Sequence, residues 1–134
     1  MLYVEDQPSD VLLVTRLMQR RGGVQVHVAR TGVGGLAAAA RLRPDVVLLD
    51  LHLPDLPGET VLYELRRLPG LCSPPVLVLS ADASPASVER LMAAGVTAYL
   101  TKPLDVASLF AHLDALEPAL PSPAPPSALT GSVA

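Results

Sequence analysis

The chain has 134 residues, of which 50% are apolar and 17% are charged, and its formal net charge is −3. This length suits one compact domain, and this composition excludes wholesale disorder. The charge, without any basic stripe, argues against nucleic-acid binding by this chain alone. No apolar run approaches the roughly 20 residues that span a bilayer, and no signal-peptide core opens the chain. Together with a single cysteine, these features predict a soluble protein of the reducing cytoplasm that contacts no membrane.

Short apolar runs alternate along the chain with segments that have the spacing of amphipathic helices. The runs predict strands at residues 2–4, 24–28, 46–49, 76–79 and 96–100. Residues 24–28 alternate apolar with polar side chains, which is typical of an edge strand, whereas 46–49 and 76–79 are wholly apolar and indicate central strands. Five strands and five helices in strict alternation predict an α/β fold, with a parallel sheet covered by helices on both faces.

Residues at the helix ends and on the helix faces support this order of elements. Pro8, Pro85 and Pro103 are expected in first helical turns, and Thr31 and Ser84 are expected N-caps. Four helices have apolar residues at helical spacing, and these residues are predicted to form buried faces. The residues are Leu13, Val14, Leu17 and Met18; Leu62, Leu65 and Leu68; Val88, Leu91 and Met92; and Val106, Leu109, Phe110 and Leu113.

Two segments are expected to be less ordered than the rest. The helix predicted at 31–42 contains glycines at 32, 34 and 35, and each costs up to about 1 kcal/mol relative to alanine. Residues 118–134 hold five prolines and no charge, so they are predicted to form a disordered tail or linker. The folded domain is therefore expected to span residues 1–117.

Polar side chains follow four of the predicted strands at the point where each strand ends. Glu5 and Asp6 follow the first strand, Asp50 the third, Ser80 the fourth and Lys102 the fifth. In a parallel sheet with helices on both faces, ligands bind beyond the carboxyl ends of the strands. Helix capping or solvation explains any one of these side chains, but does not readily explain five of them at one edge. The sequence therefore predicts a functional site at this edge of the sheet.

The charges of these side chains indicate the chemistry of the site. Three carboxylates bring −3 and the only lysine, Lys102, returns +1, so a divalent cation completes neutrality. Oxygen ligands without a nearby cysteine or paired histidines favour Mg²⁺ or Mn²⁺ over zinc. A carboxylate beside such a cation and an ammonium is suited to accept a phosphoryl group, because both cations neutralise charge on the transferring oxygens. Ser80 could then hydrogen-bond to the attached phosphoryl group.

Four segments carry a resemblance to a known family. They are residues 2–8 (LYVEDQP), 45–58 (DVVLLDLHLPDLPG), 76–83 (VLVLSADA) and 95–103 (GVTAYLTKP). In this order and spacing, the chain resembles the receiver domain of two-component response regulators over residues 2–117. The resemblance implies a flavodoxin-like, doubly wound parallel sheet of five strands in the order 2-1-3-4-5, with five helices.

The resemblance also implies roles for the residues at the strand ends. Asp50 is the expected phospho-acceptor. Glu5 and Asp6 are expected to hold the metal ion alongside Asp50, and the main-chain carbonyl of His52 supplies a further ligand. Lys102 is expected to bind the phosphoryl group once it is attached.

The remaining matches concern switching and partners. Ser80 matches the switch hydroxyl, Tyr99 the aromatic residue that changes rotamer on activation, Ala81 the small residue beside the phosphoryl site, and Pro103 the family's cis-proline. The expected function is a signalling switch rather than an enzyme, which catalyses only its own phosphorylation and dephosphorylation. Its expected donor is a histidine kinase or a histidine phosphotransfer protein. A downstream protein is expected to bind the face formed by the fourth helix, fifth strand and fifth helix.

Other functions fit parts of the sequence. The main alternative is a receiver-shaped interaction module that is never phosphorylated, although the intact set of Asp6, Asp50, Ser80 and Lys102 argues against it. A Mg²⁺-dependent phosphatase of the haloacid-dehalogenase type also uses an aspartyl phosphate, but its Asp-x-Asp motif follows the first strand, and the candidate aspartate here follows the third. A nucleotide-binding fold is disfavoured because no glycine-rich loop precedes a Lys-Ser/Thr pair.

Overall fold

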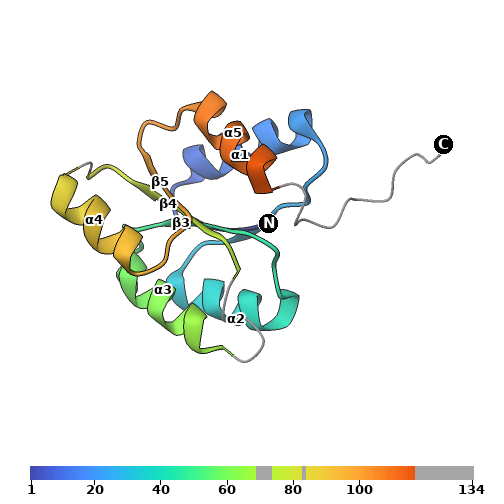
Figure 1. Ribbon diagram of the computed structural model, residues 1–134. Helices are drawn as coiled ribbons and strands as arrows, with labels where there is room; N and C mark the ends of the chain where they lie inside the picture. The colour runs from blue at the N-terminus through green and yellow to red at the C-terminus, as the bar shows by residue number, and fades with distance from the viewer. Residues whose placement is uncertain (69–73, 83, 117–134) are drawn as a thin grey trace.

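The computed structural model describes residues 1–68, 74–82 and 84–116. Five parallel strands form one sheet in the order β2-β1-β3-β4-β5 (Figure 1), so the expected doubly wound α/β fold is confirmed. The strands are β1 (Leu2–Val4), β2 (His27–Ala29), β3 (Val47–Asp50), β4 (Val76–Ser80) and β5 (Ala98–Thr101). The helices are α1 (Pro8–Arg21), α2 (Gly32–Leu42), α3 (Gly58–Arg67), α4 (Pro85–Ala93) and α5 (Val106–Leu116).

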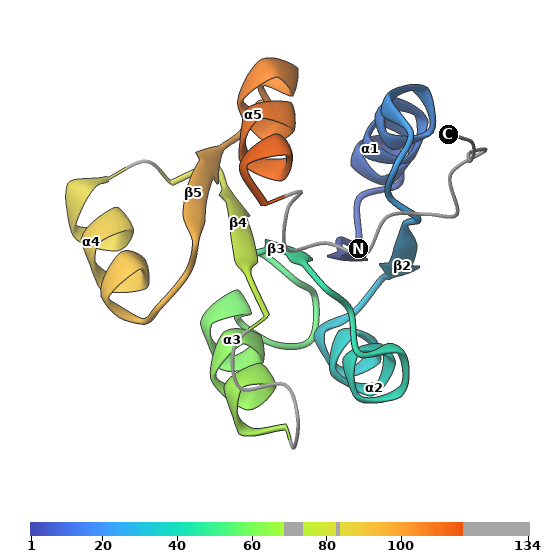
Figure 2. The same ribbon diagram turned by 45° about the vertical axis from the view of Figure 1, so that its right-hand side comes forward.

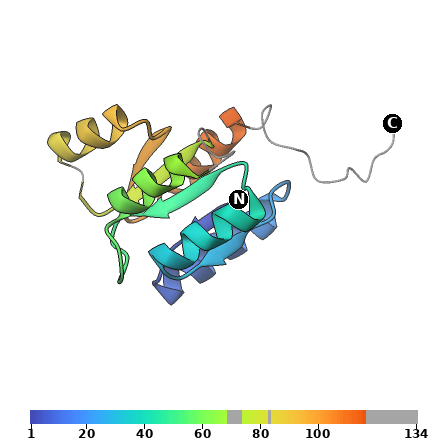
Figure 3. The same ribbon diagram turned by 90° about the horizontal axis from the view of Figure 1, so that it is seen from below.

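Helices cover both faces of the sheet. Figures 1 and 2 show α1 and α5 on one face and α2, α3 and α4 on the other, and α2 and α3 lie side by side (Figure 3). Each face has its own hydrophobic core, with Val14 and Leu109 among the buried residues of the first and Val61 and Leu91 among those of the second. Within the described part of the chain, none of the helices is long and apolar enough to cross a bilayer.

The predicted central strands are buried along their whole length, and the predicted edge strand lies at the edge. β3 and β4 have no exposed residue, and β2 ends the sheet on one side. The sequence predicts a strand from residue 24, whereas only His27–Ala29 pair with β1. Pairing is limited because β1 has only three residues. Val24 and Val26 instead pack, half-buried, against the core under α1.

β3 and β5 extend one residue further toward the predicted site than their apolar runs. β3 ends at Asp50 and β5 at Thr101, where Asp50 pairs with Leu79 and Ser80 pairs with Thr101. Hydrophobic periodicity does not report these positions, since polar side chains occupy them. The pairing holds the backbone of Asp50 and Ser80 in place at the carboxyl edge of the sheet.

Several predicted helix ends are confirmed. Pro8 and Pro85 are the first residues of α1 and α4, and the side chains of Thr31 and Ser84 cap α2 and α4. The prediction that Pro103 lies in a first helical turn is wrong.

α5 begins later than predicted, at Val106. The Asp105 carboxylate accepts hydrogen bonds from the Ala107 N–H at 3.2 Å and from the Ser108 hydroxyl at 2.7 Å. This is the arrangement of a helix N-cap, so the start of α5 is set by Asp105 and Pro103 remains in the preceding loop.

Two residues predicted on buried helix faces are exposed. Leu13 of α1 and Met92 of α4 have relative exposures of 43% and 45%, whereas their neighbours Val14 and Leu91 are buried. The buried face of each of these helices is narrower than the apolar stripe in its sequence. Only the residues on one side of each stripe are therefore buried.

The glycines of α2 allow close packing rather than preventing the helix. A Cβ atom on Gly35 would lie 2.9 Å from Cγ2 of Val4 in β1, which is too close for two carbon atoms. The expected weakness of this segment is offset by contact with the sheet, since Ala38 and Ala39 of the same helix are buried. The predicted tail after residue 117 lies outside the described residues.

Asp55, in the loop between β3 and α3, holds the N-terminus of α2. Its Oδ1 accepts from the Gly32 N–H at 2.7 Å, and its Oδ2 accepts from the Val33 N–H at 2.9 Å. These two backbone hydrogen bonds lower the pKa of the Asp55 carboxyl below its ordinary value. The segment that follows β3 is thereby tied to a second helix.

We expect Asp55→Ala to lower the melting temperature at pH 7, because two helix N–H groups lose their charged acceptor. A carboxyl whose pKa is lowered by folding stabilises the protein above its unfolded pKa of about 3.8, and that contribution fades as pH falls further. The difference between variant and wild type should therefore be smaller at a pH below 3.8 than at pH 7. Circular dichroism melts measure this, with Glu89→Ala on the exposed side of α4 as the control. An equal difference at both pH values would contradict the assignment.

Candidate functional site

All five side chains predicted at the strand ends lie at the same edge of the sheet. Glu5 and Asp6 follow β1, Asp50 ends β3, Ser80 ends β4, and Lys102 follows β5. Glu5, Asp50 and Ser80 are buried, and the Lys102 side chain is 23% exposed. This arrangement follows from parallel strands, whose carboxyl ends all point the same way.

Three carboxylates form a group that could hold a cation. One oxygen from each of Glu5, Asp6 and Asp50 lies within 4.8 Å of the other two. Oδ1 of Asp6 is buried and has no hydrogen-bond partner among the described residues. A buried carboxylate oxygen without a partner is costly, and a cation between these three side chains would provide one. The geometry and the all-oxygen donor set therefore fit a hard divalent ion.

Lys102 contacts three carboxylates with its single ammonium group. Its Nζ lies 3.1 Å from Oε1 of Glu5, 3.2 Å from Oδ2 of Asp10 and 3.4 Å from Oδ2 of Asp50. The contact with Asp50 is expected from the sequence, and the contact with Asp10 is not. The Lys102–Pro103 peptide bond is cis, as the resemblance implies.

Burial of Glu5 shapes the electrostatics of the site. Burial, followed by the shared hydrogen bond with Asp50, raises the pKa of Glu5 to about 7, although Lys102 acts in the opposite direction. Burial lowers the pKa of Lys102, but its hydrogen bond to Glu5 and the charge of Asp50 outweigh this effect and raise it. The Tyr3 hydroxyl donates to Glu5 at 3.2 Å, and burial together with the Glu5 charge raises its pKa. In the absence of a metal ion, the site therefore favours a proton on Glu5.

We expect the metal-free protein to lose stability as pH rises from about 4.5 to about 7. A carboxyl with a pKa of 4.5 in the unfolded chain and about 7 in the folded protein binds more protons when folded, so raising the pH across this window favours unfolding. Urea unfolding in a chelating buffer measures the slope. Glu5→Gln should flatten it, whereas the control Glu89→Gln should keep it. An unchanged slope in Glu5→Gln would contradict the prediction.

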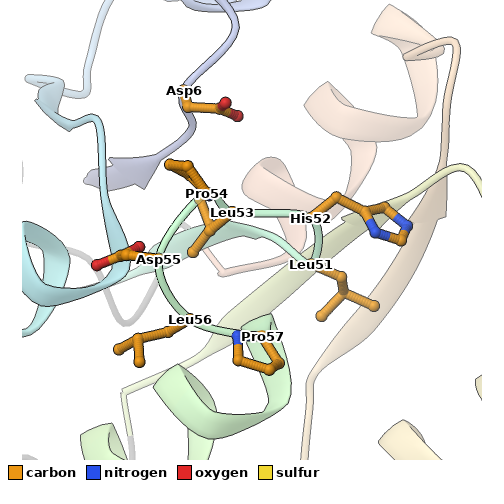
Figure 4. Close-up of a pocket in the computed structure, with 8 residues that line it drawn as sticks. All are labelled: Asp6, Leu51, His52, Leu53, Pro54, Asp55, Leu56 and Pro57. Atoms are coloured by element: carbon orange, nitrogen blue, oxygen red, sulfur yellow. The ribbon is translucent and has the colours of Figure 1, made fainter.

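The loop after β3 forms one wall of the site. Figure 4 shows residues 51–57 curving beneath Asp6, with Asp55 directed toward α2 and the His52 ring directed away from Asp6. This loop and Asp6 line a hollow of about 480 Å³. The His52 N–H donates to Oδ1 of Asp50 at 3.0 Å, which orients the Asp50 carboxylate. A Cβ atom on Gly58, the first residue of α3, would lie 2.5 Å from Cα of Leu51, so only glycine fits against the loop there.

A second set of contacts joins the end of β4 to β5 and α4. The Ser80 hydroxyl accepts from the Asp82 N–H at 3.0 Å, and the Tyr99 hydroxyl donates to the Asp82 carbonyl. The Asp82 carboxylate accepts from the Ser87 hydroxyl at 2.7 Å. Ser80, Asp82, Ser87 and Tyr99 all line a hollow of about 220 Å³ beside the acidic group. Asp82 thus links both expected switch residues to α4.

Two further residues that line this hollow, Glu59 and Arg90, form an ion pair. Arg90 of α4 donates to both carboxylate oxygens of Glu59 in α3, at 3.1 and 2.9 Å. Both side chains are about half exposed, so solvent screens the pair and it adds little to stability. The pair links α3 to α4.

Comparison with known proteins identifies the family. Residues 1–114 match the family model of the response regulator receiver domain. The chain belongs to this family. As a receiver domain, it functions in two-component signal transduction.

The receiver domain has curated relatives among longer bacterial regulators. It is 41% identical over 114 residues to the transcriptional regulatory protein KdpE of Mycobacterium tuberculosis, a match that covers 85% of this chain and 49% of KdpE. It is also 41% identical over 117 residues to the probable transcriptional regulatory protein TcrX of the same organism, covering 86% and 48%. The chain thus spans about half the length of these relatives.

Solved receiver domains share its fold. The receiver domain of the Francisella response regulator 1452 superposes with a TM-score of 0.81 at 25% identity, covering 88% of this chain and 95% of that one. The receiver domain of the sensor histidine kinase PA1611 from Pseudomonas aeruginosa, solved with a magnesium ion coordinated in the active site cleft, gives 0.78 at 29% identity, covering 87% and 95%.

Sequence reasoning missed two acidic residues of this receiver domain. Asp10 contacts Lys102, and Asp82 links Ser80 and Tyr99 to α4. Asp10 lies in the first turn of the helix that follows Glu5 and Asp6, so its position near the same edge could have been inferred. No sequence pattern indicates the partners of Asp82, because its contacts depend on the path of the loop after β4.

Proposed function

We propose that Asp50 is the phospho-acceptor of this receiver domain and that Mg²⁺ supports the transfer. The observation that carries the proposal is the placement of Asp50. Its carboxylate is buried, belongs to a three-carboxylate group within 4.8 Å, and lies 3.4 Å from the Lys102 ammonium. A nucleophilic carboxylate between an ammonium and a cation site meets the electrostatic needs of phosphoryl transfer.

Glu5, Asp6, Asp50 and the main-chain carbonyl of His52 would hold the ion. The unpartnered Oδ1 of Asp6 and the donor set of oxygens support this choice. When bound, Mg²⁺ neutralises charge on the transferring phosphoryl oxygens. The PA1611 receiver domain, which was solved with magnesium in its active site cleft, supports the same choice of metal for this chain.

The reaction needs no residue beyond this set. A carboxylate oxygen of Asp50 attacks phosphorus and forms a P–O bond, while the bond between phosphorus and the donor nitrogen breaks and the donor imidazole keeps the electron pair. Lys102 balances the charge that accumulates on the phosphoryl oxygens. Hydrolysis reverses the modification, because water attacks phosphorus and the Asp50 carboxylate leaves. The domain would thus catalyse only its own phosphorylation and dephosphorylation.

We infer that the attached phosphoryl group shifts a two-state equilibrium through Ser80 and Tyr99. Ser80 ends a buried strand beside Asp50, and Ala81, the expected small residue, follows it. The Ser80 hydroxyl accepts from the Asp82 N–H, and it could donate its own O–H to a phosphoryl oxygen. Movement of this hydroxyl toward the phosphoryl group would change its hydrogen bond with Asp82. Because the Tyr99 hydroxyl is bonded to the same residue, a change at Ser80 would reach α4 and β5.

The proposed partners follow from the site and from the family. The donor is a histidine kinase or a histidine phosphotransfer protein, acting on this domain in the cytoplasm. The acceptor of the signal is a protein that binds the face formed by α4, β5 and α5. The curated relatives are transcriptional regulators of about twice this length, so a regulator of transcription is the favoured class of output.

Phosphorylation of the intact chain tests the proposal. Incubation with acetyl phosphate and Mg²⁺ should add one phosphoryl group, which intact-mass spectrometry detects and which base or hydroxylamine removes from an acyl phosphate. A chelator should prevent the addition. A folded protein that gains no phosphoryl group, either from acetyl phosphate or from a phosphorylated histidine phosphotransfer protein, would instead support the unphosphorylated interaction module.

A further inference from the structure

Asp10 contributes a third carboxylate to Lys102 without belonging to the acidic group that could hold a cation. Its Oδ2 lies 3.2 Å from the Lys102 Nζ, whereas the cation group consists of Glu5, Asp6 and Asp50. Asp10 is also the outermost of the three partners of Lys102. Its side chain is 38% exposed, against 2% for Asp50 and 0% for Glu5.

We propose that Asp10 is a positioning residue that competes with the phosphoryl group on Asp50 for the Lys102 ammonium. This inference rests on the proposed function, since it concerns the same reaction. The unphosphorylated site holds Lys102 among three carboxylates at 3.1 to 3.4 Å. Asp10, in the first turn of α1, is the most exposed of the three partners, so it attracts the ammonium outward, whereas a phosphoryl group on Asp50 would attract it inward.

The charge balance gives the direction of the effect. Phosphorylation replaces the single negative charge of Asp50 by a group that carries close to −2 and has three strong acceptor oxygens. Lys102 must then serve this group, and the Asp10 carboxylate becomes both a rival acceptor and a neighbouring like charge. Removing the charge of Asp10 should therefore favour the phosphorylated state over the unphosphorylated one.

The backbone keeps Asp10 in place as a charged competitor. Asp10 lies in the first turn of α1, where the helix N-terminus stabilises a carboxylate. Pro8 starts that helix only three residues after Glu5, so the carboxylates of Glu5 and Asp10 approach Lys102 from two directions. The contact spans 92 residues of sequence and joins α1 to the loop before α5.

Asp10→Asn tests the proposal, because it keeps size and hydrogen bonding and removes the charge. At saturating Mg²⁺ and excess acetyl phosphate, we expect the ratio of phosphorylated to unphosphorylated protein to rise about threefold, the size typical of a partly exposed ion pair. The dissociation constant for beryllofluoride, an anionic phosphoryl mimic, should fall by the same factor. Both effects should shrink in 1 M salt, which screens exposed charges, and Asp10→Glu should behave like wild type.

Asp114→Asn is the matched control. Asp114 is an exposed acid near the other end of α5 and pairs with Arg21, so its substitution changes net charge equally without touching Lys102. A purely structural role of Asp10 would change the melting temperature but neither the beryllofluoride affinity nor its salt dependence. If Asp10→Asn has the wild-type phosphorylation ratio and beryllofluoride affinity, or binds beryllofluoride more weakly, the inference about Asp10 is wrong. The proposed function would be unaffected by that result. A wild-type protein that takes up no phosphoryl group would overturn the proposed function as well.

Discussion

Asp50→Asn should take up no phosphoryl group from acetyl phosphate and Mg²⁺ under conditions that fully modify the wild type. The amide lacks the nucleophilic oxygen charge that attacks phosphorus. Asp45→Asn is the matched control, since Asp45 is an exposed acid just before β3. Full phosphorylation of Asp50→Asn would show that the acceptor lies elsewhere.

The same substitution should raise stability in the absence of metal. Glu5, Asp6 and Asp50 place like charges within 4.8 Å, and removing one should relieve about 1 to 3 kcal/mol at the effective dielectric of a partly buried site. The asparagine oxygen can still accept the hydrogen bond that the His52 N–H donates to Asp50. Urea unfolding in a chelating buffer measures the gain. A loss of stability would contradict the view that repulsion dominates the metal-free site.

Lys102→Ala should lower the metal-free stability by about 3 kcal/mol, because the substitution leaves buried carboxylates without their cation. Breaking a fully buried ion pair costs about 3 to 5 kcal/mol, and we expect the low end of this range because the Lys102 side chain is 23% exposed. Saturating Mg²⁺, at about 100 times its dissociation constant, adds about 2.7 kcal/mol and should recover most of the loss. Arg41→Ala, which removes an exposed cation from α2, is the control in the same urea titration.

Phosphoryl acceptance should slow in Lys102→Ala, and the conformational response should be lost even in phosphorylated molecules. Lys102→Arg should restore stability but not the response, since a planar guanidinium does not replace a compact ammonium among three carboxylates. Phosphorylation-dependent NMR shifts around Ser80 and Tyr99 report the response. A wild-type response in Lys102→Arg would show that Lys102 acts only through its positive charge and not through the shape of its ammonium group.

The sheet and the carboxyl edge could be predicted because burial leaves a strong mark on parallel strands. The short, wholly apolar runs before Asp50 and in β4 are typical of strands at the centre of a parallel sheet. Because all five strands are parallel, their carboxyl ends then bring the predicted acids and Lys102 to one edge of the sheet. Contacts between side chains on different helices leave no such mark. The pairing of Arg90 with Glu59 depends on how α3 and α4 cross, which the sequence pattern does not report.

The predicted ends of strands and helices were wrong where the limits of one element depend on a neighbouring element or side chain. β2 is short because β1 is short, and α5 starts late because the Asp105 side chain bonds to the backbone and hydroxyl that follow it. Leu13 is exposed because the core under α1 is narrower than its apolar stripe. Each of these three features depends on contacts with another part of the chain. Hydrophobic periodicity is read within one segment at a time, so it does not report such contacts.

The contact between Glu5 and Lys102 joins residues 97 positions apart, at opposite ends of the sheet-forming chain. A ribosome that has synthesised β1 to β4 has therefore delivered every proposed acidic ligand and the acceptor, but not the ammonium that balances them. Lys102 enters the site only when β5 pairs with β4, so the ammonium is the last charged group of the site to be supplied. The charge balance of the site therefore depends on completion of the whole sheet.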